Sequence, residues 1–347
     1  MRNFVMEKVV FTIPSKIYHI SQIATGFHIL KKQGLPVEII DKTGDRENPF
    51  YDLPVACAEY MGKKIIYDLW DGYQNPVDMK KCLDWCDVYF KRSFSAEKNA
   101  ALFPEDQHKM FPLGFNYHVT YPTSPVNEPK LKSLLKPLMG KAPEPYFVPR
   151  VFEGKPRNTE PKDVKILFQA QLWDHRDPDL SPEMAEECAY INRTRIAIVR
   201  ALKETYGEQF FGGLRDSALA REMAPELIQS EKYTERRKYL KLVHSCDICI
   251  GSMGLHESIG WKTAEYIAAA KAIVNETFHY SVTGDFEEGR HYLAFSTAEE
   301  CIEAVRILVE NTEKRLEMQA ANAKYYQEYL KPEVLVKHTL DLVEKKF

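Results

Sequence analysis

The stretch from Asp247 to Asn275 reads DICIGSMGLHESIGWKTAEYIAAAKAIVN and holds the pattern strand, loop, helix, strand. The apolar run at its start has the length of a strand, and the loop after it carries three glycines. Lys262–Ala270 has the spacing of a helix, and Ala272–Asn275 that of a second strand. Two strands joined by a helix form a βαβ unit, which predicts a parallel sheet.

The loop of this stretch suits an anionic ligand. Gly251, Gly254 and Gly260 allow backbone N–H groups to come close to a ligand, and the next helix directs its positive end to the same place. Lys262 lies in the first helical turn, where a cation opposes the helix dipole. A bound anion would offset that conflict, so the loop predicts a diphosphate site.

Two glutamates accompany the loop. Glu265 follows Lys262 by three residues and therefore lies on the same helix face. A carboxylate at that position can accept two hydrogen bonds from a ribose diol, as in dinucleotide-binding folds. Glu257 precedes Glu265 by eight positions, which gives a Glu-x7-Glu spacing.

This segment resembles the donor site of the retaining GT-B glycosyltransferases, especially glycosyltransferase family 4 and its relatives. Those enzymes show a Glu-x7-Glu element and a Lys-x-x-Glu-Tyr-hydrophobic-Ala run before a small-residue strand, which Lys262–Ala268 and Ala272–Val274 match. The resemblance implies that Glu265 binds the nucleotide ribose, Glu257 contacts the donor sugar and Lys262 faces the phosphates. It covers about residues 164–347, and over the first half it rests on architecture alone.

The rest of the predicted donor site follows from the same loop. We expect its amides to hold the diphosphate and His256 to contact the sugar beside Glu257. His256 and Glu257, together with Asp71 of the first domain, are the candidate catalytic residues. The family's Gly-Arg pair after the first strand of the second domain is replaced here by Gln169-Ala-Gln171, and Arg176 and Arg193 are candidate substitutes. The predicted nucleotide-sugar-binding residues are Gly254, Ser258, Ile259, Gly260, Trp261, Lys262, Glu265, Arg176 and Arg193.

The whole chain shows two runs of alternating strand and helix signals, which a proline-rich passage over about residues 115–163 separates. We therefore predict an α/β protein of two Rossmann-like, doubly wound parallel-sheet domains, residues 1–160 and 161–331. Ligands of such folds bind at the carboxyl ends of the strands, here facing a cleft between the domains. By resemblance to GT-B, the last helix, residues 332–347, crosses back to the first domain.

In the first domain, Asp71 precedes Gly72 after an apolar strand. If the reaction inverts the anomeric centre, a carboxylate must deprotonate the acceptor hydroxyl, and Asp71 is our candidate base. If the reaction retains, the leaving diphosphate can take that proton. A plain turn residue ahead of a glycine is the alternative for Asp71.

Simpler interpretations stay open for the other candidates. Glu257 fits a helix-capping carboxylate as well as a sugar ligand, and Glu265 fits a surface helix position. His256 could pack against Trp261, and Arg193 fits a solvated helix face. At the level of function, a sugar-nucleotide epimerase or hydrolase, or a non-catalytic GT-B-like binding protein, are the alternatives to a transferase.

Composition excludes several classes of protein. The 347 residues carry a formal net charge of only −3, which argues against nucleic acid as a partner. No apolar stretch approaches the length of a membrane span, and the odd number of scattered cysteines fits a reducing cytoplasm. The zinc-like spacing of Cys246 and Cys249 lacks a second pair, so we expect core thiols.

We therefore expect a cytoplasmic enzyme, with peripheral contact at the inner face of a membrane left open. It would take a nucleotide-sugar donor and a glycan or lipid-linked acceptor, with no cofactor and no metal.

Overall fold

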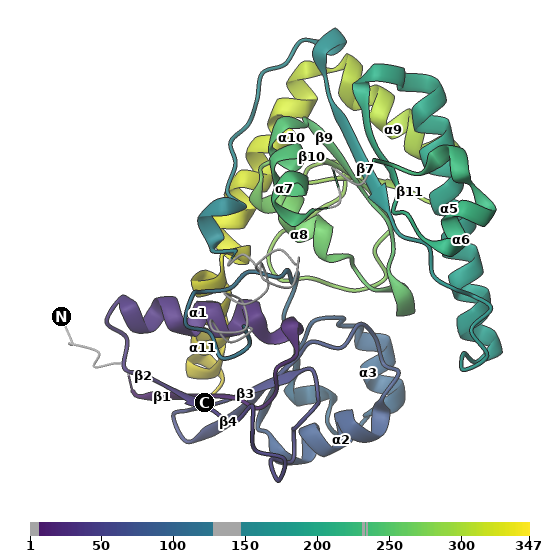
Figure 1. The fold of residues 1–347 in the computed structure, drawn as a ribbon. Helices are drawn as coiled ribbons and strands as arrows, with labels where there is room; N and C mark the ends of the chain where they lie inside the picture. The colour runs from purple at the N-terminus through teal and green to yellow at the C-terminus, as the bar shows by residue number, and fades with distance from the viewer. Residues whose placement is uncertain (1–6, 128–146, 231–232, 234) are drawn as a thin grey trace, which may run out of the picture. The chain divides into compact units, whose positions relative to one another are not determined.

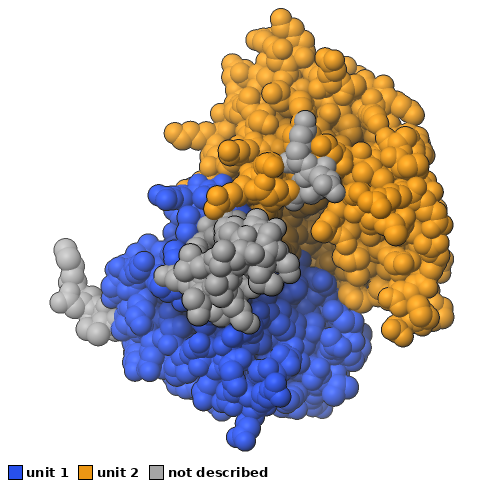
Figure 2. Space-filling model, viewed as in Figure 1, with its two compact units in different colours: residues 1–151, 281–283, 327–347 blue, residues 152–280, 284–326 orange. Residues whose placement is uncertain are grey.

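The computed structural model describes residues 7–127, 147–230, 233 and 235–347. The chain forms two compact units, each built from more than one segment (Figure 2). Unit 1 comprises residues 1–151, 281–283 and 327–347, and unit 2 comprises residues 152–280 and 284–326. Unit 2 thus begins at Phe152, inside the predicted proline-rich passage. Residues 128–146 of that passage lie outside the described part of the chain.

Unit 1 is built on a six-stranded sheet in the order β2-β1-β3-β4-β5-β6. β3 runs antiparallel to both of its neighbours, and the other pairs are parallel. A short turn at Met61 and Gly62, both with positive φ, joins β3 to β4 as a hairpin, which forces that antiparallel pairing. The strands are β1 Val9–Ile13, β2 Val37–Asp41, β3 Val55–Tyr60, β4 Lys63–Asp68, β5 Val88–Lys91 and β6 Met110–Pro112.

Helices cover this sheet on both faces. α1 and α11 lie side by side (Figure 1). Both share one core cluster with side chains of β1, β3 and β4. α2 buries Met79, Cys82 and Leu83 among Val55 and Ile66 in a separate core cluster. The α-helices of unit 1 within the described residues are α1 Ser21–Lys32, α2 Pro76–Trp85, α3 Ala96–Leu102 and α11 Pro332–Lys346.

The last helix belongs to unit 1, so the predicted return of the chain to the first domain is confirmed. α11 buries Leu335, Val336, Leu340 and Val343 in the core that α1 shares. Gly26 of α1 permits this close packing, because a Cβ atom there would collide with the carbonyl group of Pro332.

Unit 2 contains a five-stranded sheet in the order β11-β10-β9-β7-β8, and all its pairs are parallel. The two-sheet α/β fold class predicted from the sequence is confirmed, with β3 as the one antiparallel strand among those described. The strands are β7 Ile166–Ala170, β8 Phe210–Leu214, β9 Ile248–Gly251, β10 Ala272–Glu276 and β11 Leu293–Phe295.

The helices of unit 2 also lie on both faces of its sheet. α5 and α9 share one core cluster with alternate residues of β7, β9 and β10, and α10 adds Met318 to that cluster. α8 contacts β9 and β10. Because the strands are parallel, the loops that follow them meet at one edge. The helices are α5 Pro182–Tyr206, α6 Ala218–Met223, α7 Arg236–Ser245, α8 Trp261–Ala268, α9 Ala298–Glu310 and α10 Thr312–Tyr325.

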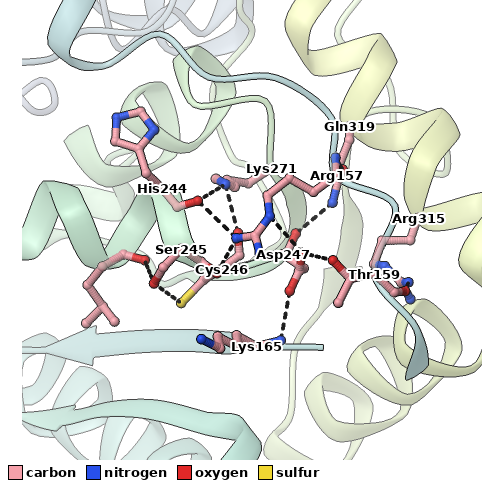
Figure 3. Close-up of polar contacts among 11 residues, drawn as sticks. Arg157, Thr159, Lys165, His244, Ser245, Cys246, Asp247, Lys271, Arg315 and Gln319 are labelled. Carbon is pink, nitrogen blue, oxygen red and sulfur yellow. Dashed lines mark hydrogen bonds and ion pairs between the residues drawn. The ribbon is translucent and has the colours of Figure 1, made fainter. Parts of the chain in front are cut away.

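At the opposite, amino edge of this sheet lies a buried polar network centred on Asp247 (Figure 3). Its carboxylate accepts hydrogen bonds from the Thr159 hydroxyl at 2.7 Å and the Lys165 amide at 2.9 Å. Arg157 lies 3.7 Å from the same carboxylate, and Lys271 donates to the carbonyl oxygens of His244 and Cys246. The network fixes the segment that enters β7 to the start of β9. We call it the amino-edge network.

Candidate functional site

A cavity of about 260 Å³ opens in unit 2 where β7 and β8 end. Three basic side chains from different segments surround it, together with three glutamines and a tyrosine. Its described lining residues are Gln169, Ala170, Gln171, Arg215, Gln229, Arg236, Tyr239 and Lys262. We call it the carboxyl-edge cavity. Its position and its basic lining suit an anionic ligand.

Lys262, the predicted phosphate ligand, stands on one side of this cavity in the first turn of α8. Its Nζ donates to the carbonyl oxygen of Gln169 and lies 5.7 Å from the ring centroid of Tyr239. Burial lowers the pKa of Lys262 from 10.5 to about 8, and the nearby cations Arg195, Arg236 and Arg215 add to this effect. A bound anion would stabilise the charged form of this lysine.

Glu265 is buried, with 2% of its surface exposed, and does not occupy the surface position considered as its alternative. Arg236 grips its carboxylate with two nitrogens, one of them at 3.1 Å. The guanidinium of Arg236 also lies 5.5 Å from the ring of Phe152. Arg236, which lines the cavity, therefore lies between the cavity and the Glu265 carboxylate. A ribose could reach this carboxylate only if that ion pair opened.

Gln229 lines the cavity and is a residue that sequence reasoning missed. No donor among the described residues reaches its Oε1, although the residue is only 8% exposed. On the same side of the cavity, Arg215 donates to Oε1 of Gln171 at 3.2 Å. Gln229 thus retains hydrogen-bonding capacity for a ligand.

The loop between β9 and α8 has an unusual backbone at the two predicted catalytic residues. His256 and Glu257 both adopt left-handed conformations, with φ of 59° and 60°, which side chains other than glycine rarely take. Tyr280 donates to the His256 carbonyl oxygen at 2.8 Å, and the Glu257 amide donates to Glu187 at 3.2 Å. Two consecutive strained residues held by specific contacts are typical of a functional loop.

Other predicted loop residues have defined places. The amide of Gly254 donates to the Ser258 carbonyl oxygen at 2.9 Å, and the amide of Ser258 donates to that of Leu255 at 3.2 Å, so the loop uses both amides internally. Gly260 is the N-cap of α8 and offers no side chain to the helix amides. Ile259 and Trp261 flank it and are half-buried.

The structure places Arg176 and Arg193 away from the described lining of the cavity. At the surface, one terminal nitrogen of Arg176 donates to both carboxylate oxygens of Glu222, at 2.9 and 3.0 Å. Arg193 is exposed on α5. The arginine that reaches the loop is instead Arg195, which falls on the buried face of the helix in register with Ile191 and Leu202. That helical spacing was the signal in the sequence.

Asp71 lies in unit 1 and its carboxylate forms an ion pair with Arg92. Ser93 donates to the Asp71 carbonyl oxygen at 2.6 Å, so β5 holds the loop after β4. Deeper in the unit, Lys91 donates to the buried Asp68 at 2.7 Å. The guanidinium of Arg92 thus occupies the Asp71 carboxylate, which is the predicted base.

The remaining expectations concern metals, thiols and membranes. All seven cysteines are free and buried, and burial raises the pKa of the Cys246 thiol to about 12. Among the described residues, no three His, Cys, Asp or Glu side chains gather as metal ligands. No helix in the described part of the chain is long and apolar enough to cross a membrane.

A comparison of the sequence with models of protein families finds one match. Residues 193–341 match the model of a family described as glycosyl transferase-like. The matched range runs from α5 to α11 and contains the strained loop, Lys262, Glu265 and Arg236. Among curated proteins, no sequence matches the chain.

Among solved structures, the similarities are at low sequence identity. The chain is similar to HepE of Anabaena in complex with UDP, with 12% identity over 98% of this chain and 100% of that one and a TM-score of 0.47. It is similar to accessory secretory protein 1, 2 and 3 of Streptococcus pneumoniae, with 11% identity and a TM-score of 0.43 over 79% of this chain and 46% of that one. A putative UDP-N-acetylglucosamine 2-epimerase from Listeria monocytogenes gives 14% identity and a TM-score of 0.39 over 80% of this chain and 65% of that one.

Proposed function

We propose that the protein is a glycosyltransferase of the GT-B type, which moves a sugar from a nucleotide diphosphate-sugar to an acceptor hydroxyl. The observation that carries this proposal is the carboxyl-edge cavity, where Lys262, Arg215 and Arg236 surround one opening beside a helix N-terminus. Among the described residues, these three cations and the carboxylate of Glu265 give a net positive site, which a diphosphate would neutralise. The glycosyl transferase-like family match over this region supports the same reaction class.

Each residue then has a role in binding the donor. Lys262 and Arg215 hold the diphosphate, with the amino end of α8 and the Gly260–Trp261 backbone contributing partial positive charge. Glu265 binds the ribose, once Arg236 turns from its carboxylate towards the ligand. His256 and Glu257 contact the donor sugar. Their strained conformation holds this part of the loop in a fixed position for that contact.

The reaction breaks the bond between the anomeric carbon and the diphosphate oxygen, and it forms a bond from that carbon to the acceptor oxygen. The electron pair of the broken bond leaves with the diphosphate, where Lys262 and Arg215 stabilise the charge. We propose that the reaction retains configuration and that the diphosphate takes the acceptor's proton. No metal is needed in this scheme, so turnover should survive EDTA. Its loss on chelation and its return with magnesium or manganese would contradict the metal-independent scheme.

The acceptor is a glycan or a lipid-linked sugar, as in glycolipid or surface polysaccharide biosynthesis, and we place the reaction in the cytoplasm or at the inner face of a membrane. Unit 1 supplies the acceptor side. Within it, Asp71 and Arg92 lie where β4 and β5 end. Should the reaction invert instead, Asp71 would have to leave Arg92 to act as the base.

The test is a product assay with a panel of nucleotide diphosphate-sugars and mixed glycan acceptors, read by mass spectrometry. Transfer that requires both substrates supports the proposal. Conversion or hydrolysis of the donor without acceptor would favour an epimerase or hydrolase on the same fold. Donor binding without any turnover would favour a non-catalytic binding protein. A Lys262→Met variant assayed in parallel shows whether the observed activity depends on the cavity.

A further inference from the structure

Three loops meet at the carboxyl edge of the second sheet, and one buried arginine joins two of them. Arg195 lies in the middle of the 25-residue helix α5, and only 7% of its surface is exposed. The residues it contacts follow β7 and β9, which are neighbouring strands of the sheet. Its side chain thus extends from the helix and contacts the two loops from their buried side.

All three nitrogens of this guanidinium are engaged. Nε donates to the Ser252 hydroxyl at 3.1 Å, and one terminal nitrogen donates to the Met253 carbonyl oxygen at 2.8 Å. The other terminal nitrogen donates to the carbonyl oxygen of Gln171. The planar fork therefore spans the turn after β7 and the start of the loop after β9. A lysine has one nitrogen and cannot span these acceptors with the same geometry.

The end of strand β10 contributes a carboxylate to the same peptide segment. Glu276, the last residue of β10, accepts a hydrogen bond from the backbone amide of Met253, with 2.5 Å between the amide nitrogen and Oε2. Met253 is thus held at its N–H by Glu276 and at its C=O by Arg195. Next to it, Gly251 lies against Asn275, which leaves no room for a Cβ atom and accepts a hydrogen bond from Thr263 at 3.0 Å.

The charges of the pair agree with this geometry. Burial lowers the pKa of Arg195 to about 10, and Glu276 opposes that shift. Burial raises the pKa of Glu276, while the Met253 amide and Arg195 oppose the rise. Each residue therefore stabilises the charged form of the other across the loop. Since protein oxygens already occupy the guanidinium, Arg195 is not placed to bind a phosphate directly.

We propose that Arg195 is a positioning residue, which with Glu276 fixes the loop of residues 251–260 for donor binding. This inference rests on the proposed function for its ligand, and it goes further by assigning the order of the loop to a residue outside the cavity. The loop carries two consecutive left-handed residues, His256 and Glu257, so it needs support from neighbouring groups to hold its conformation. Arg195 and Glu276 supply that support at its entry.

The experiment compares Arg195→Met and Arg195→Lys with Arg200→Met. Arg200 lies five residues further along the same helix, its side chain is 47% exposed, and it pairs only with the exposed Glu226 among the described residues. Ser252→Ala is a milder variant, which removes one acceptor of Arg195 and keeps the arginine. Hydrogen–deuterium exchange of the free proteins measures the order of the loop. Calorimetry with the nucleoside diphosphate that the wild type binds best, at low and high salt, measures the site.

We expect faster exchange in the peptide containing residues 251–260 of Arg195→Met, with β7 and β9 as protected as in the wild type. Affinity should fall about tenfold or more, and Arg195→Lys should not restore it. The salt dependence of binding should stay as in the wild type, because Arg195 makes no ionic contact with the ligand, whereas Lys262→Met should reduce it. Arg200→Met should resemble the wild type in every measurement.

Three results would overturn the proposal. Unchanged exchange in the loop, faster exchange spread evenly over unit 2, or full rescue by lysine would each show that Arg195 does not act through the loop. If Arg195→Met fails to fold, Ser252→Ala and Arg195→Lys decide by the same exchange measurement. If the wild type binds no nucleoside diphosphate, the proposed function fails, while the exchange comparison still tests the role of Arg195.

Discussion

The two edges of the second sheet both gather cations, yet they differ in what balances the charge. In the amino-edge network, Arg157 and Lys271 face the buried Asp247 and helix-terminal carbonyl oxygens, so each cation has a protein partner (Figure 3). At the carboxyl-edge cavity, Lys262 has one carbonyl partner among the described residues. Burial lowers its pKa, and Arg195, Arg236 and Arg215 lower it further, with Glu265 opposing them. The first arrangement is satisfied by the protein. We propose that an anion completes the second.

This difference separates a structural site from a binding site on the same sheet. A network whose charges are paired contributes to folding, and its loss leaves buried donors without acceptors. A cavity whose cations repel one another lowers stability and gains affinity for an anion in return. Variants at the amino edge should therefore lower the free energy of unfolding, and variants at the carboxyl edge should lower the affinity for the nucleotide.

The largest effect should come from the amino edge. Asp247→Ala removes the acceptor of the Thr159 hydroxyl and the Lys165 amide, and it leaves Arg157 without its carboxylate. Since each unsatisfied buried donor costs about 1–3 kcal/mol, we expect the free energy of unfolding to fall by about 3 kcal/mol. Urea denaturation checks this, with the partly exposed Asp285→Ala as control, expected within about 0.5 kcal/mol of the wild type. A loss no larger than that of the control would break the comparison.

Glu265→Ala should combine both signatures. Loss of the ribose contact should weaken nucleotide binding by about 1.5–3 kcal/mol. Because the carboxylate is buried against Arg236, we expect this variant to lose stability as well. Calorimetry and denaturation on the same preparation separate the two effects. Unchanged nucleotide affinity in a folded variant would remove Glu265 from the site.

Lys262→Met should affect binding alone. It deletes a cation of the cavity, so affinity for a nucleoside diphosphate should fall by about 1.5 kcal/mol, the low end for a charged hydrogen bond. Stability should stay equal or rise, because a buried cation near Arg195 and Arg236 is removed. A drop in stability without a change in affinity would show that Lys262 belongs to a structural network like that of Asp247.

The smallest effect concerns pH. Because the pKa of Lys262 is lowered to about 8, the free cavity loses a charge as the pH rises through that value. Diphosphate affinity should fall by at most about tenfold per pH unit above 8, and Lys262→Arg should abolish the fall. In the unfolded chain this lysine keeps its usual pKa of 10.5, so the unfolded state binds more protons between about pH 8 and 10.5, and this group's contribution to stability rises there. A flat affinity profile in the wild type would contradict the assignment.

Local patterns in the sequence were enough to predict the fold of unit 2. Alternation of short apolar runs with helical periods located β7, β9, β10 and α8, because parallel strands are apolar on both faces. The antiparallel strand β3 was missed, since Val55–Tyr60 carries no periodic contrast and its register depends on a hairpin. Pairing partners are a tertiary property that no local period encodes.

For the site, residue type and spacing identified the loop but not its partners. Lys262 and Glu265 were found through their positions in one helix. Arg236 and Gln229 lie elsewhere in the chain, and only the folded sheet brings them to the cavity. Arg176 and Arg193 were chosen for their charge, although the exposed Glu222 holds the first and solvent surrounds the second. Arg195 has the helical spacing of the buried residues Ile191 and Leu202, and this spacing predicts its burial. A choice of arginines by charge alone does not use that spacing.

The most direct test of the account is calorimetric titration of the wild type, Lys262→Met and Arg157→Met with a panel of nucleoside diphosphates. The central claim is that the carboxyl edge of the second sheet binds the diphosphate while the amino edge only supports the fold. It predicts that the wild type and a folded Arg157→Met bind the preferred ligand equally, and that Lys262→Met binds it about tenfold more weakly. Equal binding by the wild type and Lys262→Met, or selective loss in Arg157→Met, would contradict it.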